Sequence, residues 1–199
     1  MQAARGASLI GDANEPDETT PTRPRGPRLR LVALFAAVAA IAYAIDVVSK
    51  VLAVEHLSAG PDVELVGDLL VLHLVRNPGA AFSTGTAYTE ILTCIAIGAV
   101  GVILYLVRRL GSVGWAVALG LLLAGVGGNL TDRLLREPGP LRGHVIDFLM
   151  LPHWPVFNVA DICINAAAVL ILILVARGIR IDGTRTPKET KDAGAGAAQ

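Results

Sequence analysis

The sequence predicts an all-α integral membrane protein with four transmembrane helices and a small extracytoplasmic β element. Of the 199 residues, 53% are hydrophobic and only 17% are charged, whereas soluble domains carry about 25% charged residues. The mean hydropathy is +0.59. The apolar residues also gather into runs of about 18 residues, the length that crosses a bilayer as a helix. The formal net charge is zero, so we expect no nucleic-acid partner.

The first predicted span runs from Leu31 to about Val54, after a polar segment, 1–30, that we expect to be a disordered tail. The arginines before Leu31, the short apolar core and Ala42-Tyr43-Ala44 are also typical of a cleaved secretory signal. Apolar residues continue well past Ala44, however, which favours an uncleaved span. Asp46 and Lys50 stand four residues apart and therefore share a helix face, which allows them to pair.

A mixed segment, 55–89, separates the first two spans. Two short strands are predicted within 63–75, joined near Gly67-Asp68, and Asn77-Pro78-Gly79 is a turn signal. The three remaining spans are predicted at 91–107, 113–135 and 158–176. A loop, 136–143, follows the third span, and the final tail, 178–199, is expected to be disordered.

The basic residues predict how these spans are oriented. Segments 1–30, 108–112 and 177–199 hold 12 of the 17 Lys and Arg residues, against 3 in segments 55–89 and 136–156. Cytoplasmic segments carry the excess of Lys and Arg. Both termini are therefore predicted to be cytoplasmic, which agrees with an even number of spans.

This topology brings every polar residue of the spans to one depth, near the outer surface of the membrane. The residues are Asp46, Lys50, Asn129, Asp132, Arg133, Asn158 and Asp161, with Asp147 in the loop before the fourth span. Ionisable residues inside a membrane are costly and mark functional sites. We therefore predict a site at the outer leaflet surface.

Asp147 and Asp161 are the candidate reacting groups, because apolar sequence surrounds them and no basic residue lies between them. If the two carboxylates meet, repulsion and burial raise one pKa and provide one acid and one base. Asp46 lies near Lys50, and Asp132 lies next to Arg133. We therefore interpret these two carboxylates as ion-paired groups that support the site. The lone cysteines, Cys94 and Cys163, lie in apolar runs, and the four histidines lack metal-ligand spacing, so neither a disulfide, a metal nor a cofactor is predicted.

Five motifs follow one another between residues 46 and 161. They are Asp46-Val47-Val48-Ser49-Lys50, Asn77-Pro78-Gly79-Ala80-Ala81-Phe82, Gly128-Asn129-Leu130-Thr131-Asp132-Arg133, Val145-Ile146-Asp147-Phe148 and Phe157-Asn158-Val159-Ala160-Asp161. In order and in residue type they resemble the bacterial lipoprotein signal peptidase family, also called signal peptidase II.

The resemblance implies a membrane aspartic endopeptidase, comprising residues 31–177, in the bacterial inner membrane. Its catalytic pair would be Asp147 and Asp161, and its partners would be membrane lipids and prolipoproteins with a diacylglyceryl-modified cysteine, which it cuts on the N-terminal side of that cysteine. We expect a monomer. The supporting residues would be Asp46, Lys50, Asn77, Gly79, Asn129, Asp132, Arg133, Asn158 and Ala160.

Two departures from the family and two rival functions stay open at this point. Segment 136–142 looks like an insertion, and the stretch between Asp147 and Asp161 looks short, so the loop that carries Asp147 is expected to differ in shape. Asp132 is a rival for the catalytic role. A proton-coupled transporter would need carboxylates at mid-membrane depth, and a non-enzymatic membrane scaffold would need no reactive pair.

Overall fold

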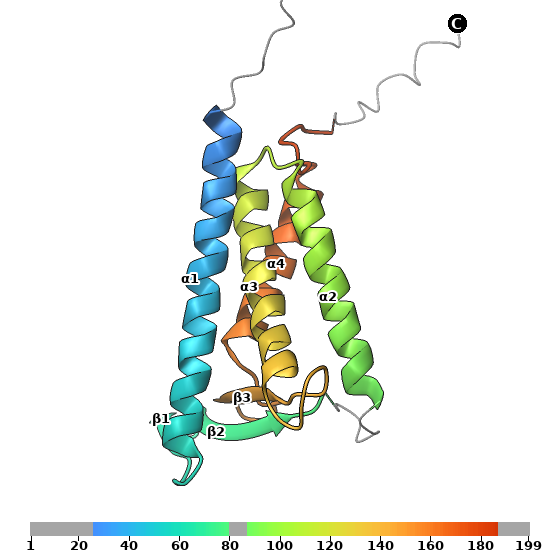
Figure 1. Ribbon diagram of the computed structural model, residues 1–199. Helices are drawn as coiled ribbons and strands as arrows, with labels where there is room; N and C mark the ends of the chain where they lie inside the picture. Colours follow the sequence, from blue (N-terminus) through green and yellow to red (C-terminus); the bar gives the residue numbers. More distant parts are fainter. Residues whose placement is uncertain (1–25, 80–86, 187–199) are drawn as a thin grey trace, which may run out of the picture.

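The computed structural model describes residues 26–79 and 87–186, which form a bundle of four helices with a small sheet at one end (Figure 1). The helices are α1 (Gly26–Leu57), α2 (Ala87–Val107), α3 (Val113–Leu135) and α4 (Val159–Ala176), and the strands are β1 (Val63–Val66), β2 (Leu70–Asn77) and β3 (Val145–Met150). All four helices are long and apolar enough to cross a membrane. These features confirm the predicted fold class.

Two helices are longer than the apolar runs that predicted them. α1 begins at Gly26 and ends at Leu57, beyond the expected 31–54, and α2 begins at Ala87 rather than Ile91. Arginine is a good helix former, so Arg28 and Arg30 continue α1 beyond the apolar run. The expected disorder is therefore wrong for residues 26–30, and residues 1–25 lie outside the described part of the chain.

Helix α3 packs against the other three helices and is the centre of the bundle. A Cβ atom added at Gly125 would lie 2.5 Å from the carbonyl oxygen of Ala160, and one added at Gly128 would collide with the carboxylate of Asp46. These two glycines therefore let α4 and α1 approach α3 closely. The main apolar core lies toward the end of the bundle away from the sheet and includes Phe35, Ile103, Trp115, Leu119 and Leu174.

The sheet has the order β1-β2-β3, with antiparallel neighbours. The predicted hairpin is confirmed, and Gly67 at its turn has a positive φ of 48°, which glycine adopts without strain. The assignment of Asp147 to a loop is wrong, because it lies in β3 opposite Val75. Residues Val145 to Phe148 are all buried, so this strand lacks the alternation of apolar and polar residues that reveals a half-buried strand.

The prediction of a disordered tail from residue 178 is also wrong for residues 178–186. The indole Nε1 of Trp115 donates to the carbonyl oxygen of Ile179 at 2.9 Å, and the amide of Gly111 donates to Ile181 at 2.8 Å. Both isoleucines pack against the apolar core, which explains why this short segment is ordered. Residues 80–86 and 187–199 lie outside the described part of the chain.

Candidate active site

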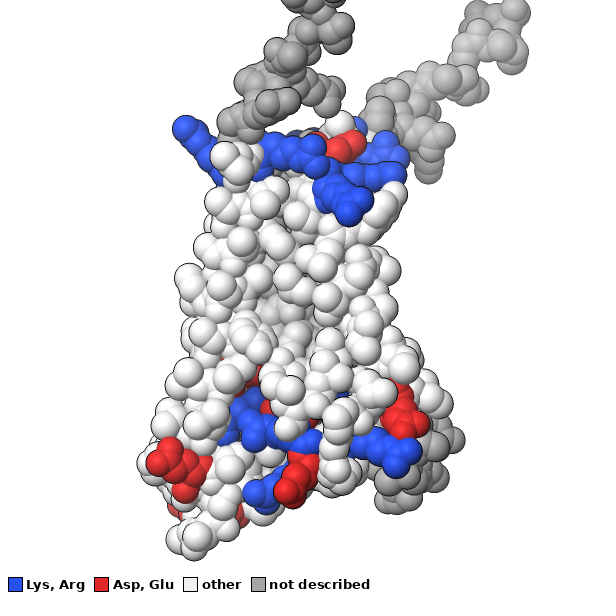
Figure 2. Space-filling view, in the orientation of Figure 1, with Lys and Arg blue, Asp and Glu red and all other residues white. Residues whose placement is uncertain are grey.

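Charged side chains gather at the two ends of the bundle, with an uncharged band between them (Figure 2). At the end that carries the sheet, polar side chains from α1, α3, β3 and the start of α4 form one hydrogen-bonded network. The carboxylates of this network therefore lie at one end of the bundle and not halfway along the helices, unlike the relay that a transporter would need.

Lys50 is the buried cation of this network, with 1% of its side chain exposed. Its Nζ lies 2.9 Å from Asp46 Oδ2 and 2.9 Å from Asp132 Oδ2, and it donates to Asn129 Oδ1 at 3.0 Å. A buried ammonium group is stable only when it is paired and fully hydrogen-bonded. Lys50 thus joins α1 to α3, and the predicted pairing of Asp46 with Lys50 is confirmed.

Asp132 forms ion pairs with Lys50 and with Arg136, the residue that caps the end of α3. The predicted pairing of Asp132 with Arg133 is wrong, because adjacent residues of a helix point in different directions. The carboxylate of Asp132 also accepts the backbone amide of Ile146 at 3.3 Å. Asp132 therefore fixes β3 at the residue just before Asp147.

Asn158 and Asp161 cap the start of α4 reciprocally. Asn158 Oδ1 accepts the amide of Asp161 at 3.0 Å, and Asp161 Oδ2 accepts the amide of Asn158 at 3.2 Å. The other oxygen, Oδ1 of Asp161, accepts Asn129 Nδ2 at 2.9 Å. Asp46 Oδ1 accepts the amide of Ala160 at 2.8 Å. Backbone and amide donors thus fix the carboxylate of Asp161 without a cation.

Asp147 lies in β3 with 2% of its surface exposed. Its Oδ2 accepts Asn77 Nδ2 at 2.8 Å and its Oδ1 accepts Asn158 Nδ2 at 2.6 Å. Burial raises the pKa of Asp147 to about 6, because the loss of hydration outweighs the hydrogen bonds from Asn77 and Asn158, and the charge of Asp161 adds to the rise. Asn158 contacts both Asp147 and Asp161, so one residue connects the two carboxylates.

Arg133 and Gly79 meet on the side of the network next to the turn after β2. Gly79 has a φ of +92°, and its amide donates to Asn77 Oδ1 at 2.8 Å. A Cβ atom at Gly79 would lie 2.8 Å from Cδ1 of Leu92, which is too close, and in ordinary contact with the two terminal nitrogens of Arg133, at 3.6 and 3.7 Å. The turn thus orients Asn77 toward Asp147 and brings the backbone next to the guanidinium group of Arg133.

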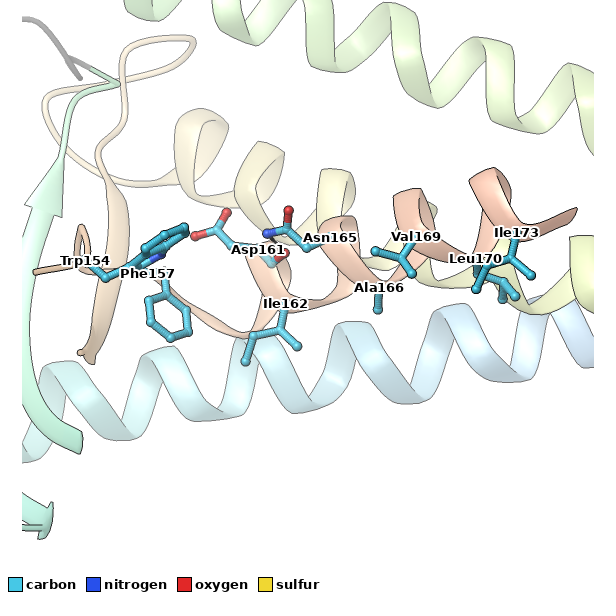
Figure 3. A pocket seen from close by; sticks show the side chains of 9 residues that line it. All are labelled: Trp154, Phe157, Asp161, Ile162, Asn165, Ala166, Val169, Leu170 and Ile173. Atoms are coloured by element: carbon cyan, nitrogen blue, oxygen red, sulfur yellow. Dashed lines mark hydrogen bonds between the residues drawn. The ribbon is translucent and has the colours of Figure 1, made fainter. Parts of the chain in front are cut away.

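An apolar groove of about 530 Å³ runs along α4 from Asp161 (Figure 3). Trp154 and Phe157 lie beside Asp161 at one end of the groove, and Ile173 lies at the other. Asp161 and Asn165 are its polar side chains; the remaining residues that line it are Ile162, Ala166, Val169 and Leu170. The groove therefore leads from a carboxylate into the part of α4 that crosses the membrane.

Sequence reasoning missed two parts of this site. One is the ion pair of Arg136 with Asp132: Arg136 lies just after α3, as the predicted loop has it, but its spacing of four residues from Asp132 brings the two side chains together. The groove was missed because its walls read as ordinary apolar sequence. Within residues 26–79 and 87–186, no cluster of three or more His, Cys, Asp or Glu side chains is arranged to hold a metal ion.

The chain matches the family model described as "Signal peptidase (SPase) II" over residues 38–177. It is 50% identical to the lipoprotein signal peptidase of Mycolicibacterium smegmatis over 77% of this chain and 66% of that protein. It is 52% identical to the lipoprotein signal peptidase of Mycobacterium avium over 70% of this chain and 76% of that protein. The lipoprotein signal peptidase of Rhodococcus jostii is 48% identical over 73% of each chain.

Two solved structures of bacterial membrane enzymes share the fold. One superposes with a TM-score of 0.64 and 26% identity, over 72% of this chain and 92% of that one. The other gives a TM-score of 0.65 and 24% identity, over 79% of this chain and 94% of that one. The helical bundle with its small sheet is thus an architecture already found in bacterial membrane enzymes.

Proposed function

The chain belongs to the signal peptidase II family of membrane peptidases, and we propose that Asp147 and Asp161 are its catalytic pair. The observation that carries this assignment is a difference in pairing among the four carboxylates of the network. Asp46 and Asp132 are paired with Lys50, and Asp132 also with Arg136. Asp147 and Asp161 form no ion pair with any described residue and accept hydrogen bonds only from amide groups.

The two carboxylates take different roles in the proposed reaction. Asp147 holds the proton, in keeping with its raised pKa, and Asp161, which lines the groove, is the base. Asp161 removes a proton from a water molecule as the water oxygen attacks the peptide carbonyl carbon. Asp147 donates its proton to the carbonyl oxygen. As the C–N bond breaks, the protonated Asp161 gives its proton to the leaving amine. Asp147 takes back a proton from one hydroxyl of the intermediate, so both carboxyl groups return to their starting states.

The proposed substrate is a prolipoprotein whose cysteine carries a diacylglyceryl group, cut on the N-terminal side of that cysteine. The groove along α4 is apolar apart from Asp161 and Asn165, so it suits the apolar parts of such a substrate. With both termini of the enzyme in the cytoplasm, the network lies at the outer leaflet surface. The enzyme is proposed to act there as a monomer, with the acyl chains of its substrate in the bilayer.

The first test is cleavage by Asp147→Asn and Asp161→Asn variants in detergent, with a synthetic lipopeptide that carries a diacylglyceryl cysteine. General acid or base catalysis contributes about 10²- to 10⁴-fold, so we expect the rate of each variant to fall by at least about 100-fold. Mass spectrometry identifies the bond that is cut.

Asp68→Asn is the matched control, because Asp68 is exposed in the β1–β2 turn and the substitution is chemically the same. It should cleave at the wild-type rate. If either site variant cleaved as fast as the Asp68 control, the assignment of the catalytic pair would be wrong.

A further inference from the structure

Asn165 is a polar side chain in the middle of a surface that is otherwise apolar. It lies on α4 one turn after Asp161, is exposed, and lines the same groove (Figure 3). At a rise of 1.5 Å per residue, it stands about 9 Å along the helix from Val159. A polar side chain at such a depth is costly unless it is hydrogen-bonded.

The amide group of Asn165 has hydrogen-bonding capacity to spare. One N–H of its Nδ2 donates to the backbone carbonyl of Asp161 at 2.9 Å. Within residues 26–79 and 87–186 it forms no other hydrogen bond, although a primary amide has a second N–H and an acceptor oxygen. The spare donor lies in the groove one turn beyond a carboxylate of the site.

We propose that Asn165 is a specificity-determining residue that donates this second hydrogen bond to a carbonyl oxygen of the substrate. This inference rests on the proposed function. With the scissile bond at Asp161, the substrate groups that lie deeper in the membrane carry two kinds of carbonyl: the esters of the diacylglyceryl group and the backbone of the signal peptide. Both are acceptors that lose their water on entering the groove, so a donor there improves binding.

Asn165→Leu tests this assignment, because leucine has the same branched arrangement of side-chain heavy atoms as asparagine, without the polar atoms, and suits a lipid-facing helix. The variant and the wild type are compared on two lipopeptides of equal chain length, one with ester-linked and one with ether-linked glyceryl chains. Loss of one hydrogen bond predicts a KM about 3- to 10-fold higher, with kcat unchanged.

The two substrates distinguish the two carbonyls. If Asn165 binds an ester, the wild type has a higher KM on the ether substrate than on the ester substrate, and the variant has the same high KM on both. If Asn165 binds the peptide backbone, the variant has the higher KM on both substrates and the wild type treats them equally. An unchanged KM on both substrates, or a fall confined to kcat, overturns the proposal.

A control variant and a separate measurement complete the design. Cys94→Leu introduces the same residue at an exposed position of α2 and should leave KM unaltered. Cleavage of the ester substrate by the wild type, and its loss in Asp161→Asn, tests the proposed function independently of Asn165. A failure of this inference is thereby separated from a failure of the catalytic assignment.

Discussion

Asp147 is the residue in which the environment most clearly changes the chemistry. Two side-chain amides donate to its carboxylate, and such donors favour the ionised form. Burial in β3 has the opposite effect and is larger, so the pKa of Asp147 rises from 3.8 to about 6. A carboxyl group in this state can hold a proton near neutral pH, which general acid catalysis requires.

The pH dependence of cleavage follows from this pKa. Asp147 donates a proton in the proposed mechanism, so kcat/KM should fall as the pH rises through about 6, by about tenfold per unit well above it. Initial rates on the lipopeptide between pH 4.5 and 9 measure the profile, and thermal unfolding at each pH controls for loss of structure. A rate that increased through this range would instead make Asp147 the base.

For single residues, the sequence predicts ion pairs between residues that are close along the chain, but not those between distant residues. Asp46 and Lys50 lie four residues apart, so their pairing could be read directly. The contact of Lys50 with Asp132 joins two helices, and no local pattern contains it. The pairing of Asp132 with Arg133 was wrong because neighbours in sequence diverge on a helix.

Among the elements, α3 sets the geometry of the site, because its glycines allow the neighbouring helices to approach closely. Gly125 faces the backbone of α4 at Ala160, and Gly128 faces Asp46 of α1. Close approach here brings Asn129 within reach of both Lys50 and Asp161. The distances from α3 to α1 and α4 thus decide whether Asn129 can form both hydrogen bonds.

Gly125→Ala should therefore destabilise the protein. Its Cβ would lie 2.5 Å from a backbone carbonyl oxygen, and overpacking of this kind costs about 1–3 kcal/mol. Unfolding of the purified protein in mixed micelles of increasing SDS content measures the change.

Gly101→Ala is the matched control on α2, where an added Cβ meets nothing within 4 Å. Alanine favours helix over glycine by about 1 kcal/mol, so this variant should be at least as stable as the wild type. Equal stability of the two variants would show that the contact between α3 and α4 can accommodate an added methyl group.

The helices could be read from the sequence and β3 could not. An apolar run long enough to cross a bilayer is a strong signal, and it indicated all four helices. Val145–Met150 is short and buried along its first four residues, so neither length nor alternation distinguished it from a loop. Its pairing with β2 depends on a chain reversal of about 70 residues that sequence patterns do not encode.

For the molecule as a whole, the two charged ends differ in kind. At the end with the sheet, Lys50, Arg136 and Arg142 are each paired with a carboxylate, whereas Arg76 and Arg133 form no ion pair with a described residue. At the other end, Arg28, Arg108, Arg109, Arg177 and Arg180 form no ion pair with the residues that the structure describes (Figure 2). An excess of Lys and Arg next to the spans predicts that this end faces the cytoplasm.

The prediction at this scale is the orientation in the membrane, which decides the face from which substrate arrives. After Cys94 and Cys163 are replaced by alanine, single cysteines are introduced as Ser58→Cys at the end with the sheet and Thr184→Cys at the opposite end; both positions are exposed. A membrane-impermeant maleimide added to intact cells should label the first, and should label the second only after permeabilisation. The reverse pattern would place the catalytic pair in the cytoplasm and exclude a substrate held in the outer leaflet. Labelling of both positions in intact cells would contradict the even number of spans.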